Sequence, residues 1–133
     1  MQDVRFHYLQ RGNVSIGYYD RFCFGGEVLM IHVWYKEPGK IGKDRWIQNE
    51  LHVFQQLVGG YIEVVRLRKS LDYCLIVNEE GLLNDMPLNL VVGDNFLFGP
   101  IIVVGLTQGE DGAEFTSCNL KADQVRRMLL KEG

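Results

Sequence analysis

Hydrophobic and polar residues repeat in patterns that divide most of the chain into strands and two short helices. The clearest helix lies in residues 49–58, where Leu51, Phe54, Leu57 and Val58 recur at three- and four-residue spacing. This spacing places one apolar stripe along a helix of about ten residues, which is too short to be stable alone. The helix is therefore expected to bury its stripe on a sheet.

The residues at the two ends of this helix predict where it begins and ends. Asn49 is the predicted N-cap, because its side-chain oxygen can accept a free backbone N–H of the first turn. Gly59 follows the last apolar residue and suits the left-handed C-cap position, and Gly60 completes the reversal. Residues 61–65 are mostly aromatic or β-branched, so a strand is expected directly after the glycines.

The other apolar runs predict the rest of the sheet. Residues 28–35 are apolar on both alternating faces, which is typical of a central strand, and residues 37–40 (EPGK) predict a turn that ends it. Residues 61–65 and 71–78 are joined by a short link, which favours an antiparallel hairpin. A polar connection is expected over residues 40–48 and an irregular segment over residues 82–92. Shorter strands are expected at residues 95–98, 101–106 and 114–117, separated by a break at Gly99-Pro100 and a polar turn at residues 108–112.

The two ends of the chain have their own patterns. From Leu120 a final helix is predicted, with Leu120, Val125, Met128 and Leu129 on its apolar side and Asn119 as its cap. Near the start, residues 4–18 alternate around Gly12-Asn13, which predicts a β-hairpin. We therefore divide the chain into an N-terminal hairpin extension at residues 1–27 and a main domain at residues 28–133.

These elements together predict an α+β fold in one compact unit. We expect a mixed, mostly antiparallel sheet with two short helices packed on one face and an N-terminal β-hairpin beside it. The order of strand, helix and strand over residues 28–65 suggests a right-handed crossover, if the two strands run parallel in one sheet.

Composition and charge limit the function classes. The chain has 133 residues, which suits one domain with one core, and 47% of its residues are hydrophobic. The net charge of −3 argues against a general binder of nucleic acid, which would carry a basic excess. No apolar run reaches the length of about 20 residues that a membrane helix needs. Cys23, Cys74 and Cys118 show no CxxC spacing and no secretory leader precedes them, so we expect reduced thiols in a cytoplasmic protein.

A series of short motifs follows in fixed order through the last three quarters of the chain. They are EPGK at residues 37–40, ELHVFQQLVGGYIEVV at 50–65, LIVNEEGLL at 75–83, MPLN at 86–89, VVGDNFLFGPIIVVG at 91–105 and EFTS at 114–117. Through these motifs, residues 33–131 resemble the DUF3846 family, a domain of unknown function. The resemblance implies an accessory protein of a phage, plasmid or other mobile element, acting in the cytoplasm of the host cell. It implies no catalytic residue, and residues 1–27 lie outside it.

Candidate reaction centres are weak in this sequence. His32 with the adjacent acids Glu79 and Glu80 would suit a small hydrolase, provided that the three side chains meet in one pocket. The Gly59-Gly60 pair follows a helix, whereas phosphate-binding loops precede one, and no nucleotide-binding motif occurs elsewhere. We therefore expect neither an enzyme nor a bound cofactor or metal.

Aromatic and basic side chains favour binding instead. The N-terminal part is rich in aromatic residues, which supply contact area at interfaces between protein chains. Arg66, Arg68 and Lys69 form a small basic cluster near Tyr61, which suits a protein interface, a nucleotide or, less well, a nucleic acid. The residues expected to bind a ligand or partner are Phe6, Tyr8, Tyr18, Tyr19, Phe22, Tyr61, Arg66, Arg68, Asn78 and Glu79.

We accordingly expect a non-enzymatic accessory protein of a phage or mobile element. It would bind a host protein, such as a CRISPR or restriction effector, or sequester a small nucleotide signal. Assembly into a homodimer or a higher homo-oligomer is a further expected use of the aromatic N-terminal part. A small hydrolase and a nucleic-acid-binding protein are the alternatives, and no association with a membrane is expected.

Overall fold

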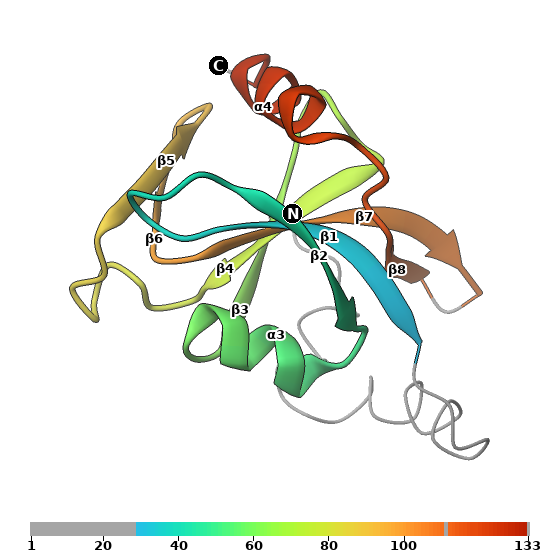
Figure 1. Cartoon of the computed structure of the whole chain (residues 1–133), viewed down its shortest axis with the longest axis horizontal. Helices are drawn as coiled ribbons and strands as arrows, with labels where there is room; N and C mark the ends of the chain where they lie inside the picture. The colour runs from blue at the N-terminus through green and yellow to red at the C-terminus, as the bar shows by residue number, and fades with distance from the viewer. Residues whose placement is uncertain (1–28, 111, 133) are drawn as a thin grey trace.

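The computed structural model describes residues 29–110 and 112–132 as an α+β fold, and the predicted N-terminal hairpin lies outside these residues. Antiparallel sheet makes up the largest part of the described chain, and two short helices pack on it (Figure 1). The elements are β1 (Met30–Lys36), β2 (Lys43–Gln48), α3 (Leu51–Val58), β3 (Ile62–Arg66), β4 (Tyr73–Asn78), β5 (Leu88–Val92), β6 (Asn95–Phe98), β7 (Ile101–Gly109), β8 (Gly112–Thr116) and α4 (Ala122–Leu130).

The central strand of the main sheet is β7. The sheet has the order β2-β1-β7-β4-β3, and β8 pairs with the second half of β7. Every ladder between described strands is antiparallel, so the prediction of a mixed sheet was wrong. The hairpin of β3 and β4 is confirmed, as is the interior position of β1. Strands β5 and β6 form a separate two-stranded sheet beside the main one.

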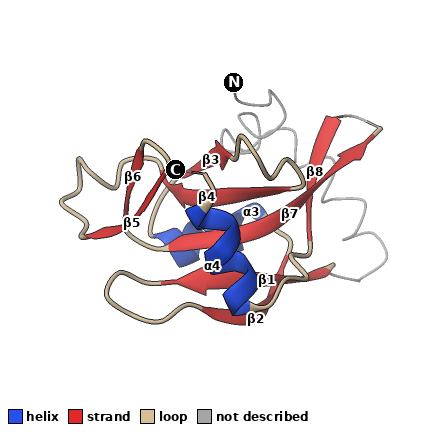
Figure 2. Ribbon diagram, turned by 90° about the horizontal axis from the view of Figure 1, so that it is seen from above, coloured by secondary structure: helices blue, strands red, loops and turns tan. Residues whose placement is uncertain are grey.

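The two helices cover opposite faces of the sheet, so the prediction that both lie on one face was wrong (Figures 1 and 2). Strand β7 shows why this is possible, since successive side chains of a strand point to opposite faces. Ile102 and Val104 join the core under α3, whereas Ile101 and Val103 join the core under α4. A strand that is apolar on both faces needs a cover on each side, and one helix supplies each cover.

Residues 40–48, predicted as a polar connection, contain β2 instead. This strand lies at the edge of the sheet, and Ile47 is its only buried side chain. Hydrogen bonds to β1 keep β2 in the sheet. Its exposed charged residues are typical of an edge strand. The predicted crossover is absent because β1 and β3 run in opposite directions, as the ladders through β7 and β4 require.

The start of α3 differs from the prediction, and its end agrees with it. Asn49 is not the N-cap; Glu50 occupies that position without a side-chain bond to the helix. The Asn49 side chain is buried and donates through Nδ2 to the carbonyl of Phe115, 3.3 Å away. Gly59 ends the helix at φ +83°, and its N–H donates to the carbonyl of Gln55 over 2.8 Å. A residue without Cβ fits this left-handed geometry best.

The C-terminal helix and the segment before β6 also need correction. Asn119 is not the cap of α4; the N-cap is Lys121, whose N–H donates to the Gln124 side chain over 2.8 Å. The predicted apolar side is confirmed at the three buried residues Val125, Met128 and Leu129. Residues 82–92, predicted as irregular, end in strand β5. Neither helix in the described part of the chain has the length and apolar character needed to cross a membrane.

Candidate binding groove

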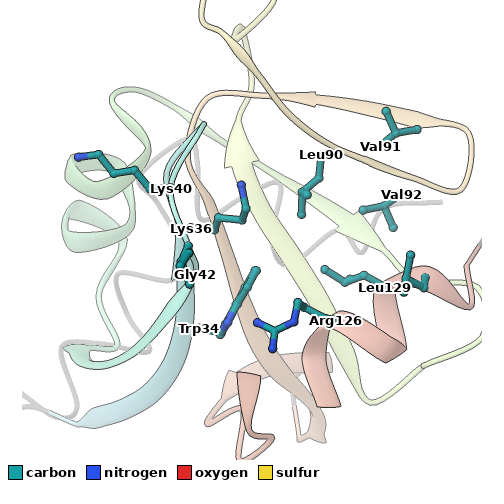
Figure 3. A pocket seen from close by; sticks show the side chains of 11 residues that line it. Trp34, Lys36, Lys40, Gly42, Leu90, Val91, Val92, Arg126 and Leu129 are labelled. Atoms are coloured by element: carbon teal, nitrogen blue, oxygen red, sulfur yellow. The ribbon is translucent and has the colours of Figure 1, made fainter. Parts of the chain in front are cut away.

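An apolar groove lies on the α4 face of the molecule, between α4, β5 and the loop from β1 to β2 (Figure 3). Its volume is about 370 Å³. Pockets of roughly this size hold small ligands or single side chains of a partner. The lining residues are Trp34, Lys36, Lys40, Ile41, Gly42, Leu90, Val91, Val92, Arg126, Leu129 and Leu130.

Trp34 forms the floor of the groove. Along β1, Val33 points into the core under α3 and Trp34 into the core under α4, where only 2% of its surface is exposed. Gly42 lies against the indole ring so closely that a methyl group there would overlap Cζ2. Glycine at position 42 is therefore what allows the β1–β2 loop to close over the tryptophan.

The indole N–H of Trp34 is buried without a hydrogen-bond partner among the described residues. Leaving a buried donor unpaired costs about 1–3 kcal/mol. Buried tryptophans ordinarily place this N–H against an acceptor. The floor of the groove thus carries a donor that an incoming oxygen atom would satisfy.

Asn89 fixes the distance between β5 and β1, and so the width of the groove. Its Nδ2 donates to the carbonyl of Lys36 over 2.9 Å and to that of Gly99 over 2.8 Å. Its Oδ1 accepts from Lys36 Nζ at 2.6 Å. The side chain of one half-buried asparagine therefore ties the hairpin of β5 and β6 to the main sheet.

Glu132 anchors the chain just after α4, and so holds in place the wall of the groove that α4 forms. The buried carboxylate accepts the backbone N–H of Arg68 over 2.8 Å and that of Lys69 over 2.9 Å. Hydrogen bonds to an ionised acceptor are stronger than neutral ones. The last turn of α4, with Leu129 and Leu130 in the groove wall, is held in place by this contact.

Three cationic side chains surround the groove, and they differ in their partners. Lys40 lies 3.7 Å from the Glu37 carboxylate, and its ammonium points away from the cavity (Figure 3). Lys36 and Arg126 have no carboxylate partner within the described ranges. Burial lowers the pKa of Lys36, since the charged form is partly removed from water. The groove therefore has two cations that no carboxylate of the described residues pairs with.

The binding residues predicted from the sequence do not gather at this groove. Tyr61 and Asn78 line a shallow hollow at one end of β3, whereas Arg66 and Arg68 line another at its opposite end, with Glu132. Five residues of a strand separate these ends by roughly 15 Å. The predicted residues Phe6, Tyr8, Tyr18, Tyr19 and Phe22 lie outside the described residues.

Asn78 and Glu79 have local structural contacts. The buried Asn78 side chain donates to the carbonyl of Val58 over 3.1 Å and accepts the N–H of Glu80 over 2.7 Å. Glu79 lies exposed in the turn after β4, and its N–H donates to the carbonyl of Tyr61 over 2.8 Å. Asn78 therefore stabilises the junction of α3 with β4.

The side chains of the hydrolase alternative do not converge. In the sheet, Trp34 lies opposite Val103, and Val103 lies opposite Leu75. His32 and Tyr73 each come two residues earlier on their strands, which run in the same direction, so these two residues lie level across the sheet. Glu79 is six residues beyond Tyr73, or about 20 Å along the strand. His32 instead contacts Asp44 Oδ2 at 2.9 Å and the Cys118 carbonyl at 3.1 Å. Across residues 29–110 and 112–132, no three His, Cys, Asp or Glu side chains gather as metal ligands would.

The described cysteines are free, buried thiols. Burial raises the pKa of Cys74 to about 12 and also raises the pKa of Cys118. A thiol with so high a pKa carries almost no thiolate at neutral pH and is a poor nucleophile. Cys74 and Cys118 form no disulfide among the described residues, and Cys23 lies outside the described ranges.

Sequence reasoning missed the groove because its residues come from three distant segments, residues 34–42, 90–92 and 126–130. Trp34, Leu90 and Arg126 are separated by dozens of positions, and no short motif joins them. The available signals were local: a tryptophan in a two-sided strand, and a glycine after the EPGK turn. Neither signal specifies which surface the final helix would cover.

The described residues form an α+β domain with an apolar groove on the α4 face. The sequence model of DUF3846, a domain of unknown function, matches residues 31–130. This chain therefore belongs to the DUF3846 family, as its motifs suggested. Searches of curated proteins and of solved structures found no match.

Proposed function

We propose that this chain is a non-enzymatic accessory protein that binds a host protein, and that the groove holds an apolar side chain of that partner. The observation that carries this proposal is the apolar lip of the groove. Ile41 is 78% exposed and Leu130 is 79% exposed, although both border an apolar cavity. Large apolar side chains grouped around a pocket are typical of protein interaction sites.

The apolar surface continues beyond the lip. Val91 lines the groove and lies opposite Phe96 in the ladder of β5 and β6, and both side chains are exposed. A partner that placed one anchor in the groove would cover this pair as well, which enlarges the contact. We propose a host defence component as the partner, in keeping with the mobile-element origin that the family resemblance implies.

A small nucleotide signal fits the groove less well. Nucleotide sites usually offer an accessible aromatic face and several backbone N–H groups for phosphate. Only 2% of the Trp34 surface is exposed, which is too little for a base to stack on its ring, and the walls of the groove are aliphatic. The groove therefore favours an aliphatic or aromatic anchor from a protein.

Site-specific photo-crosslinking tests the proposal. A photoreactive residue at Ile41, on the lip, should crosslink one partner protein in host lysate, and a second at Leu130 should capture the same partner. His52 provides the matched control, because it is exposed on α3 and lies on the opposite face of the sheet. Val91→Asp, which places a charge in the apolar wall, should abolish the crosslink from Ile41.

The pattern of crosslinks decides the outcome. Capture from both lip positions, lost in Val91→Asp and absent at His52, supports the proposal. Capture of the same proteins from His52 as from Ile41 would show that the groove has no special role. A lip position that captures nothing would contradict protein binding at this site.

A further inference from the structure

We infer that the partner segment is acidic as well as apolar: its anchor side chain enters the groove and a carboxylate beside it meets Trp34 Nε1 and Arg126. This inference rests on the proposed function and adds the chemistry of the partner. It follows from the few polar groups that the groove offers, all of which are hydrogen-bond donors or cations.

The floor of the groove contains a buried hydrogen-bond donor, the indole N–H of Trp34. Trp34 Nε1 carries a hydrogen and can only donate. It has no acceptor within the described part of the chain, and the aliphatic side chains of Leu90, Val92 and Leu129 line the same groove as Trp34. An occupant that ended in methyl groups alone would leave this donor unpaired, at a cost of about 1–3 kcal/mol. An occupant with an oxygen atom at that depth removes the penalty.

The charged side chains that line the groove are all positive. Arg126 directs its guanidinium toward the Trp34 ring (Figure 3). The neighbouring Arg127 pairs with Asp123 at 3.3 Å, and Arg126 has no such partner in the described ranges. Lys36, on the opposite wall, holds only the neutral Asn89 oxygen and a backbone carbonyl. A carboxylate placed between the two walls would meet two cations, whereas an ammonium group would be repelled by both.

An occupant of the groove must match both its positive charge and its apolar lining. A free inorganic anion would neutralise the cations but leave the walls of Leu90 and Val92 in water. A purely aliphatic segment would fill the walls and leave the donor and both charges unmatched. A segment that carries an aromatic or branched aliphatic residue next to an aspartate or glutamate matches both properties.

Peptide titration followed by nuclear magnetic resonance tests this inference on the full chain. The probe is the capped tetrapeptide Glu-Phe-Leu-Glu, and its counterparts are Lys-Phe-Leu-Lys and Glu-Ser-Ser-Glu. The indole N–H resonance of Trp34 is the readout, assigned with Trp46→Phe, which removes the other indole signal. The acidic apolar peptide should shift this resonance saturably, and we expect the lysine peptide to bind about tenfold more weakly, a difference of about 1.4 kcal/mol.

The matched variants are Arg126→Gln and Arg127→Gln. They lie side by side on α4 and both are exposed, so neither should disturb folding. Arg126→Gln should reduce the preference for the acidic peptide by several-fold, while Arg127→Gln should leave it unchanged.

Each result separates this inference from the proposed function. Equal binding of the acidic and lysine peptides, or binding of Glu-Ser-Ser-Glu as strong as that of Glu-Phe-Leu-Glu, would overturn the inference. So would an unchanged preference in Arg126→Gln. If no peptide shifts the Trp34 resonance at millimolar concentration, the inference is overturned, and crosslinking from Ile41 then decides whether a partner of other chemistry uses the groove.

Discussion

In the described part of the chain, the two faces of the central sheet carry one helix each, but they differ in how completely their polar groups are paired. Under α3, Tyr35 donates to the carbonyl of Leu57 over 3.2 Å and Asn78 donates to that of Val58 over 3.1 Å. These carbonyls belong to the last turn of the helix, where no partner within the helix is available. Under α4, the N–H of Trp34 has no partner among the described residues, and the side chain borders a groove.

This difference separates stability from recognition in one small domain. On the α3 face, side chains from β1 and β4 complete the hydrogen bonds of the helix that covers it. The α4 face is anchored at two points, Glu132 and Asn89, and the space between them remains open. Mutations on the first face should therefore affect folding most, whereas mutations at the groove should affect binding with smaller changes in folding.

The largest expected effect is the loss of Phe54 on the α3 face. Its ring is fully buried and meets Phe115 edge to face, with ring centroids 5.3 Å apart. Phe54→Ala should lower the free energy of unfolding by about 3–5 kcal/mol, because it removes buried surface and leaves a cavity. Urea denaturation measures the change.

The exposed groove residue Leu130 is the control for this substitution. Leu130→Ala should change the free energy of unfolding by less than about 0.5 kcal/mol. Similar losses in the two variants would contradict the contrast between the two faces.

A smaller effect is expected at Asn78. Asn78→Ala removes both bonds of the side chain and leaves the Val58 carbonyl and the Glu80 N–H without this partner. We expect the free energy of unfolding to fall by about 2 kcal/mol. If Asn78→Ala unfolds at the wild-type urea concentration, the paired groups of this face contribute little.

The sequence predicted the strands whose pattern depends on neighbours along the chain. The hairpin of β3 and β4 and the Gly59 cap follow from local spacing and from backbone geometry that favours glycine, and both are confirmed. Strand β2 was missed because an edge strand is selected by its ladder with β1, and its exposed side chains carry no apolar pattern. The side of the sheet that each helix covers depends on contacts between distant residues, which local periodicity does not contain.

The same limit applied to individual side chains at the predicted sites. Asn49 and Asn78 both suited local roles, one as a cap and one as a ligand, yet each forms a buried bond to a distant backbone carbonyl. Only the folded arrangement brings those carbonyls within reach. The groove has the same origin, since Trp34 is a core residue by pattern and becomes its floor only where α4 and β5 leave a gap.

Trp34→Phe should cost less than a buried tryptophan normally would. The substitution removes contact area, but it also removes a donor that has no partner in the described part of the chain. We expect the free energy of unfolding to fall by only about 1 kcal/mol, since relief of the unpaired N–H offsets part of the lost packing. Trp46→Phe, at an exposed position of β2, is the control and should be nearly neutral. A loss as large as that of Phe54→Ala would show that the indole N–H is bonded in solution.

The smallest expected effect concerns Glu63, which projects from β3 on the α4 side because its neighbours Ile62 and Val64 point into the core under α3. Burial first, and the nearby Glu79 carboxylate second, raise the pKa of Glu63 in the folded chain. The ionised form is therefore less favourable in the folded state than in the unfolded state. Stability should be highest below the ordinary glutamate pKa and should decline as pH rises through the raised folded pKa.

Glu63→Gln removes this ionisation and should flatten that decline. Since the side chain is largely exposed, water screens the effect, and we expect a gain of only a few tenths of a kcal/mol at neutral pH. Urea denaturation at neutral pH and at a pH below the ordinary glutamate pKa measures the difference between variant and wild type, which should vanish at the lower pH. Glu79→Gln should give part of the same gain, because it removes the second cause. If Glu63→Gln is less stable than wild type at neutral pH, the fold stabilises the ionised Glu63 carboxylate. The α4 face, which we describe as incompletely paired, would then contain a favourable charge contact.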